Sequence, residues 1–268
     1  MNQPQPAPSI VVGIDGSDAA TNAAKWAAVE SSSRNLPLRL VHVVNGSAAG
    51  TSVVAPDLEM QYAETVLCEV DAVLRAGSSA AKVETAIVRG SPSQSLIDES
   101  RDSALVCVGS LGIGRVSRAI FGSTATELAY GAHCPVAIVR AHDDASRAAR
   151  GWIAVAVDHT PGNDLLLKHA FREAQLRHLP LLALEAQRWQ RVGQLDHRIE
   201  RWASRYPDVR VRLSLLQRGL PEALSCTGEP IALAVLGKHD VDDMTRIVGP
   251  VRHDVPDRTG CSVLVVRD

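Results

Sequence analysis

The sequence has few aromatic residues and almost no net charge. Phenylalanine, tryptophan and tyrosine make up 3% of its 268 residues, which argues against the base-stacking platforms of proteins that bind single-stranded nucleic acid. A formal net charge of −2 gives no general attraction to nucleic acid. With 46% hydrophobic and 22% charged residues, the composition is that of a soluble globular protein.

Long hydrophobic runs and paired cysteines are also missing. No apolar run approaches the roughly 20 residues that a membrane-spanning helix needs. The N-terminal segment MNQPQPAP is polar and rich in proline, without the charged and apolar regions of a signal peptide, so we expect a cytoplasmic protein. The five cysteines are odd in number and show no CxxC spacing, which argues against disulfide or metal chemistry.

One stretch, residues 109–124 (GSLGIGRVSRAIFGST), places four glycines between a short apolar run and a helical pattern. Glycine lets the backbone approach an anion closely, and the start of a helix offers unpaired N–H groups and a partial positive charge. The stretch therefore predicts either a phosphate site or a plain turn, and taken alone it does not separate the two.

Apolar runs of strand length alternate with helical patterns along the first half of the chain. Continuous runs without polar alternation are typical of strands buried on both faces, as in a parallel sheet. The order βαβαβαβαβ, with crossovers of this length, predicts a parallel α/β sheet whose ligands bind at the carboxyl ends of the strands. The predicted strands are residues 9–14, 38–44, 82–88, 104–108 and 135–140, and the predicted helices are residues 20–34, 58–76, 93–100 and 123–132.

The pattern then repeats after a polar segment, residues 141–151, that we interpret as a linker. Five segments of the first half recur in the same order in the second, which indicates an internal duplication. The predicted domains are residues 9–140 and 152–268, and the second is shorter, mainly in the loop that corresponds to residues 45–57. The recurring segments are 10–15 at 152–158, 35–38 at 178–181, 88–92 at 217–221, 105–109 at 233–237 and 134–140 at 261–267.

The segment VGIDGS (residues 12–17) and the spacing G-x2-G-x9-G-S from Gly109 to Ser123 resemble the universal stress protein family, and more narrowly its tandem-domain mycobacterial and actinobacterial members. The resemblance implies two five-stranded, Rossmann-like domains of the adenine nucleotide alpha hydrolase type, with strand order 3-2-1-4-5. It also implies ATP binding and a regulatory role in stress or dormancy with at most slow ATP hydrolysis. The paired domains are expected to meet through their fifth strands as an intramolecular pseudo-dimer, with self-association into a homodimer as a further option.

The same resemblance implies a set of ligand-binding residues in the first domain. Asp15 lies near the adenosine and the metal-bound phosphates, and residues 41–43 meet the adenine through backbone groups. Mg²⁺ is the expected cation, because a bound triphosphate needs charge compensation. At the helix start, Gly122, Ser123 and Thr124 would give backbone N–H and hydroxyl donors to the phosphates. The implied binding residues are Asp15, Gly16, Ser17, Val41, Val43, Gly109, Gly112, Arg115, Gly122, Ser123 and Thr124.

Several of these residues also have a purely structural interpretation. Asp15 could cap the helix that follows it, and Thr124 with Glu127 has the spacing of a capping box. Arg115 could screen phosphate charge or be a solvated side chain. His42, on the second predicted strand, is more typical of a packed residue than of a catalytic one.

The second half departs from the binding pattern. Gly237 is kept, but Asp240 stands where the first half has Gly112, and Pro250 stands at the final glycine-serine position. A carboxylate repels phosphate, and proline has no N–H to donate. We therefore predict a folded second domain that binds ATP poorly or not at all; the alternative is a different ligand held by Lys238 and Arg246.

Three functions follow from these patterns. The first is an ATP-binding regulatory protein. The second is an interaction module in which the nucleotide motif is vestigial. The third is an α/β enzyme, which ranks last because the sequence shows no set of residues arranged for nucleophilic or acid–base catalysis.

Overall fold

The computed structural model describes residues 8–44, 56–77, 82–112, 122–140, 151–158, 160, 162–186, 194–216, 219–248 and 261–267. The chain divides into two compact units, residues 1–141 and 142–268. Predictions for the N-terminal segment, the greater part of the loop 45–57, the greater part of the linker, Arg115 and Pro250 lie outside the described residues. Within the described ranges, no helix is long and apolar enough to cross a membrane.

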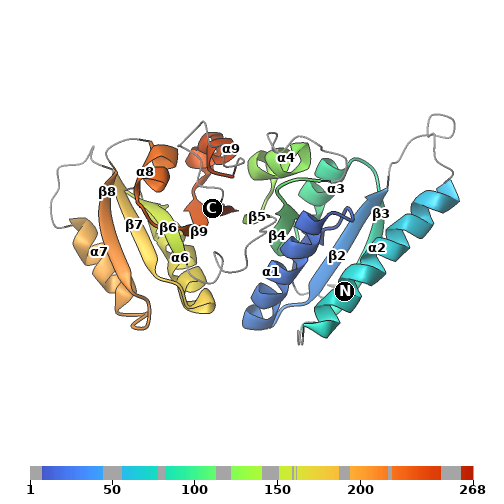
Figure 1. Cartoon of the computed structure of the whole chain (residues 1–268), viewed down its shortest axis with the longest axis horizontal. Helices are drawn as coiled ribbons and strands as arrows, with labels where there is room; N and C mark the ends of the chain where they lie inside the picture. The colour runs from blue at the N-terminus through green and yellow to red at the C-terminus, as the bar shows by residue number, and fades with distance from the viewer. Residues whose placement is uncertain are drawn as a thin grey trace, which may run out of the picture. The chain divides into compact units, whose positions relative to one another are not determined.

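The first unit is a five-stranded parallel sheet flanked by helices (Figure 1). Its strands lie in the order β3-β2-β1-β4-β5, as predicted. The order reverses between β1 and β4, which makes their carboxyl ends the topological switch point of the sheet. The elements are β1 (Ser9–Gly13), α1 (Asp18–Arg34), β2 (Leu38–Val44), α2 (Pro56–Ala76), β3 (Val83–Arg89), α3 (Pro92–Glu99), β4 (Ser103–Gly109), α4 (Ser123–Gly131) and β5 (Val136–Val139).

Helices cover both faces of this sheet. Helix α1 packs with α2, and α3 packs with α4, because right-handed crossovers on either side of the reversal place the two pairs on opposite faces. Successive β1 residues, Ile10 to Val12, are therefore fully buried whichever way they point. The alanines of α1, among them Ala23 and Ala27, are fully buried and let that helix lie close to the strands.

The second unit repeats the fold with the strand order β8-β7-β6-β9-β10, which is again 3-2-1-4-5. Helix α7 has 10 residues where α2 has 21, so the second helix is the most shortened element. The elements are β6 (Trp152–Val157), α6 (Asn163–Arg177), β7 (Leu181–Ala186), α7 (Gln194–Ala203), β8 (Val211–Leu216), α8 (Leu220–Cys226), β9 (Ile231–Leu236), the 3₁₀ helix η1 (Lys238–Asp243), α9 (Met244–Val248) and β10 (Ser262–Val265).

The end of the first helix is almost identical in the two units. Asn35 (φ 51°) and His178 (φ 54°) both end their helices in the left-handed conformation. One turn earlier, a fully buried glutamate pairs with an arginine, Glu30 with Arg34 at 2.6 Å and Glu173 with Arg177 at 3.0 Å. The same helix end and the same buried ion pair at matching positions are consistent with an internal duplication.

Candidate functional site

A pocket of about 330 Å³ opens at the switch point of the first unit. The carboxyl ends of β1, β2 and β4 form its floor together with the beginning of α4. Nine of the eleven predicted binding residues line it; Gly16 stands between two of them, and Arg115 lies outside the described residues. The lining residues are Gly13, Ile14, Asp15, Ser17, Ala20, Val41, His42, Val43, Pro92, Leu96, Val108, Gly109, Leu111, Gly112, Gly122, Ser123, Thr124 and Ala125.

The turn after β1 is organised by Asp15. Its Oδ1 accepts hydrogen bonds from the Ser17 backbone N–H at 3.0 Å and from the Ser17 hydroxyl at 2.6 Å. Gly16, between them, has φ 88°, a left-handed conformation that favours glycine. The capping interpretation of Asp15 was wrong, because Ser17 caps α1 by accepting from the Ala20 N–H at 3.1 Å. Asp15 shapes the turn and leaves the helix start to its neighbour.

The two glycines after β4 have different neighbours. A Cβ atom on Gly109 would lie 2.7 Å from the Ala19 carbonyl carbon, so this glycine is needed for the close approach of α1. A Cβ on Gly112 would lie 2.6 Å from the Asp15 Oδ2. The carboxylate and the glycine stretch therefore meet at one point of the pocket wall.

Helix α4 begins at the pocket without a side-chain cap. Its N-cap is Gly122, and Ser123 and Thr124 are its first two residues, so the predicted capping box from Thr124 to Glu127 was wrong. The Gly122 N–H donates to the Ser110 carbonyl at 3.1 Å, which commits the donor that we expected this glycine to offer. The first-turn N–H groups that follow have no partner within the helix, so they present donors and a partial positive charge to the pocket.

The end of β2 contributes backbone groups. The Val41 carbonyl accepts from the Ile14 N–H at 2.8 Å, on the β1 side of the strand. Because the backbone groups of a strand alternate in direction, those of Val43 point to the same side. The β1–β2 register ends at Gly13 opposite Val41, so Val43 faces the space beyond β1.

His42 lies between these two valines and is 8% exposed. Burial lowers its pKa from the ordinary value, and a hydrogen bond with the Ile14 backbone and the charge of Asp15 offset part of that effect. The imidazole is therefore neutral at neutral pH. The residue pattern favoured a packed or interfacial His42 over a catalytic one and did not indicate that the side chain lines the pocket, although its place within residues 41–43 was a signal.

The apolar side of the pocket was also missed. Pro92 and Leu96 of α3 line it beside Val108 of β4. Their approach depends on how α3 lies across the sheet, which residue patterns do not reveal.

In the second unit the turn after the first strand keeps the same shape. The Asp158 Oδ1 accepts from the Thr160 N–H at 2.8 Å and from the Thr160 hydroxyl at 2.6 Å, as Asp15 does with Ser17. The crevice beside it is filled differently. Asn163, at the position that corresponds to Ala20, is 3% exposed and donates to the Ala156 carbonyl at 3.1 Å.

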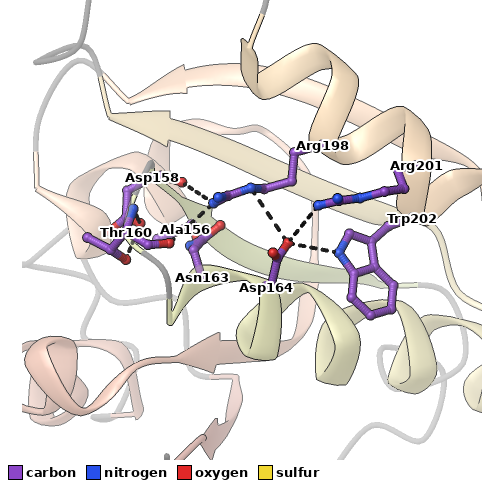
Figure 2. A network of polar contacts seen from close by, with 8 residues as sticks. All are labelled: Ala156, Asp158, Thr160, Asn163, Asp164, Arg198, Arg201 and Trp202. Carbon is purple, nitrogen blue, oxygen red and sulfur yellow. Dashed lines mark hydrogen bonds and ion pairs between the residues drawn. The ribbon is translucent and has the colours of Figure 1, made fainter.

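Charged side chains of the second unit close over this turn (Figure 2). Arg198 of α7 donates to the carbonyls of Asp158 at 3.0 Å and Thr160 at 3.3 Å. Its guanidinium also lies 3.5 Å from the Asp164 carboxylate. The same carboxylate oxygen accepts from Trp202 at 3.2 Å, so Arg198 is held firmly in this position.

Asp240 occupies the remaining position of the lost motif. Its carboxylate accepts from the Gly237 N–H at 3.1 Å. Burial raises the pKa of Asp240, the Gly237 hydrogen bond opposes the rise, and the nearby charges of Asp243 and Asp158 add to it. Of the two cations proposed to hold another ligand, Lys238 and Arg246, the arginine is itself paired with Glu222 and Asp243. Phosphate would meet carboxylates and filled space here.

Known proteins match the whole chain. A model of the universal stress protein family matches residues 8–140. The universal stress protein Rv2624c of Mycobacterium tuberculosis is 41% identical over 97% of this chain and 96% of its own length. A second protein of that organism, universal stress protein Rv2028c, is 36% identical over 99% of this chain and 98% of its own length.

A solved structure supports the fold. The universal stress protein from Archaeoglobus fulgidus has a TM-score of 0.69 and covers 97% of this chain and 96% of its own, at 16% identity. The sequence relatives decide the family, because they exceed 30% identity along nearly the complete chain. The chain belongs to the universal stress protein family, as its glycine spacing and early aspartate indicated.

Proposed function

We propose that the first unit binds ATP in the pocket at its switch point and that the protein acts as a nucleotide-dependent regulator of a stress or dormancy response. The observation that carries this proposal is the meeting of an uncapped α4 start with Asp15 and Gly112 in one pocket. The pocket's size suits a small-molecule site, and its apolar side beside Leu96 suits a base.

Each part of the nucleotide has a matching part of the pocket in this proposal. The adenine lies along the end of β2, where the backbone groups of Val43 face open space. The phosphates lie at the first turn of α4, against the N–H groups and hydroxyls of Ser123 and Thr124. Gly112 and Gly122 let the chain pass close to the ribose and phosphates, and Gly16 and Ser17 complete the turn beneath them.

Mg²⁺ fits this pocket as a partner of the phosphates. Asp15 is the only carboxylate among the described lining residues, so most of the magnesium ligands would be phosphate oxygens and water, as is usual for this ion. Bound there, the ion supplies charge compensation. The other titratable side chain of the described lining, His42, is buried and neutral, so we propose binding with at most slow hydrolysis.

The two aspartates provide a matched test. Asp15→Ala and Asp158→Ala remove the same two hydrogen bonds from the same kind of turn, so both should cost similar stability. Isothermal titration calorimetry with ATP and Mg²⁺ should show one site per chain in the wild type. Asp15→Ala should weaken binding at least about tenfold, as expected for losing a charge-assisted contact of 1.5–3 kcal/mol, and Asp158→Ala should leave it unchanged.

The competing function is an interaction module with a vestigial site. The second unit supports this alternative, because the same fold has the polar side chains of Asn163 and Asp240 at the equivalent crevice. Absence of ATP binding in the wild type would favour it. Self-association through the fifth strands is also a proposal, which sedimentation velocity of the full chain would test.

A further inference from the structure

Tyr62 of α2 reaches across to the turn after β1. Its hydroxyl donates to the Asp15 carbonyl at 3.2 Å, a contact between residues 47 positions apart. Its ring lies edge-on to His42, with centroids 5.8 Å apart and planes at 72°. The residue is 46% exposed, so solvent reaches part of the side chain beside these two contacts.

The carbonyl that accepts the Tyr62 hydrogen bond belongs to Asp15, and Asp15 also positions part of the pocket wall. Asp15 orders Ser17 through its carboxylate, and the Ser17 hydroxyl lies 3.4 Å from the Leu111 carbonyl in the glycine stretch. Gly112 abuts the Asp15 Oδ2. A displacement of the Asp15 backbone would therefore shift both the α1 cap and the wall beside the glycines.

The phenol keeps the proton that this contact needs. Burial raises the pKa of Tyr62 from its ordinary value, and the negative charges of Asp15 and Glu69 raise it further. The hydroxyl is therefore a donor throughout the neutral range.

The second unit shows that a donor from this helix is a recurring part of the fold. Arg198 of α7 donates to the Asp158 carbonyl, at the position equivalent to Asp15 (Figure 2). The arginine also reaches the Thr160 carbonyl and thereby covers the turn. Tyr62 makes one hydrogen bond, to the Asp15 carbonyl, and brings no charge to the turn. The turn of the first unit therefore stays accessible.

We propose that Tyr62 is a positioning residue for the nucleotide site, whose hydrogen bond holds the Asp15–Ser17 turn in its binding shape before the ligand arrives. The inference rests on the proposed ATP binding of the first unit. Preorganisation of a binding loop raises affinity because the ordering cost is not incurred on binding.

The test removes one oxygen atom. Tyr62→Phe keeps the ring against His42 and loses only the bond to Asp15. Tyr206→Phe is the matched control, because it removes the same atom from the second unit, where the ring stacks on Phe171 and Trp202. Both variants and the wild type are compared by calorimetry with ATP and Mg²⁺, and by hydrogen–deuterium exchange of the nucleotide-free protein.

For Tyr62→Phe we expect the Kd for ATP to rise about threefold to tenfold, the range for one lost hydrogen bond. The amides of residues 14–21 should exchange several times faster, whereas Tyr206→Phe should change neither quantity. Equal affinity in Tyr62→Phe and wild type overturns this inference alone, and so does weaker binding with unchanged exchange. Absence of ATP binding in the wild type overturns the proposed function and this inference together.

Discussion

The two units of this chain have the same strand order and different crevices. At the switch point of the first unit, Ala20, Gly112 and the α4 start leave a pocket open. At the equivalent point of the second unit, Asn163 and Asp240 occupy the space and Arg198 covers the turn. The comparison separates the features that both copies share from those that are present in the first copy alone.

The Asp-x-Ser/Thr turn belongs to the fold by this criterion, and so does the donor from the second helix to the aspartate carbonyl. Gly112 does not, because Asp240 stands at its equivalent position. Gly112 therefore carries the strongest indication of a ligand in this comparison, whereas Asp15 alone would be a weak one.

The largest effect should come from the paired glycines Gly109 and Gly237, which stand at equivalent positions. Gly109→Ala places a Cβ 2.7–2.8 Å from backbone atoms of Ala19 and Ala20, so we expect a loss of about 2–3 kcal/mol in the free energy of unfolding. Gly237→Ala meets its neighbours at 3.5–3.6 Å and should cost less than about 1 kcal/mol. Urea unfolding of each variant measures the difference.

Equal losses in the two variants would show that the close approach of α1 is not what requires glycine in the first unit. Because Gly109→Ala acts on the fold, a loss of ATP binding in that variant would say little about the site. Gly112 is the better glycine for ligand studies, since its Cβ would meet the movable end of a side chain.

A smaller effect is expected for Arg198→Met, which opens the cover of the second unit. The change removes hydrogen bonds to two carbonyls and the interaction with Asp164, so we expect a loss of about 1–2 kcal/mol in the free energy of unfolding. Thermal unfolding monitored by circular dichroism measures it. Affinity for ATP, determined by calorimetry, should not change.

If Arg198→Met bound a second equivalent of ATP, Arg198 alone would be what closes the crevice. That result would contradict the interpretation that Asn163 and Asp240 also fill it. The exposed Arg205→Met is a suitable control, since that guanidinium stacks on Trp202 and makes none of the contacts to the turn.

The smallest effect is expected for Asp240→Asn, and it depends on pH. Burial raises the folded pKa of Asp240 above the unfolded value, so between the two values the folded state binds more protons and its stability falls as pH rises. The asparagine cannot ionise but can still accept from Gly237. At pH 7 the variant should therefore be more stable than the wild type, by less than about 1 kcal/mol.

The gain should shrink as the pH falls toward the unfolded pKa, because the folded wild-type carboxyl, whose pKa is higher, is by then protonated and uncharged like the asparagine. Urea unfolding at pH 7 and pH 4.5 gives both values. Asp242→Asn, which makes the same substitution at an exposed neighbour, is the matched control. A variant that is less stable than wild type at pH 7 would mean that the carboxylate is net stabilising.

The sequence predicted the sheet well because its strands are buried on both faces. Residues 104–108 (ALVCV), for example, form a continuous apolar segment, and β4 contains all of them. The meeting of Asp15 with the glycine stretch was also predictable, since parallel strands bring their carboxyl ends to one edge.

What the sequence did not reveal depends on how helices lie across the sheet. The packing reason for Gly109 involves Ala19, 90 positions away, and the cover by Arg198 involves a turn 40 positions away. Neither contact produces a periodic pattern of residue types along the sequence. The donor of Gly122 was misassigned for a similar reason, because its partner is a backbone carbonyl, which every residue type has.

The buried pairs Glu30–Arg34 and Glu173–Arg177 bear on how such a chain can be recombined. Each glutamate is fully buried, and removal of one partner from a buried pair costs about 3–5 kcal/mol. Each pair lies within a single helix, so an exchange of the whole first helix between units transfers both charges together. A crossover point placed between the paired residues would not leave a buried glutamate without its arginine either, because both copies supply the same two residue types at the same spacing. The duplicated pair thus makes the two halves interchangeable at this position, even though their crevices have diverged.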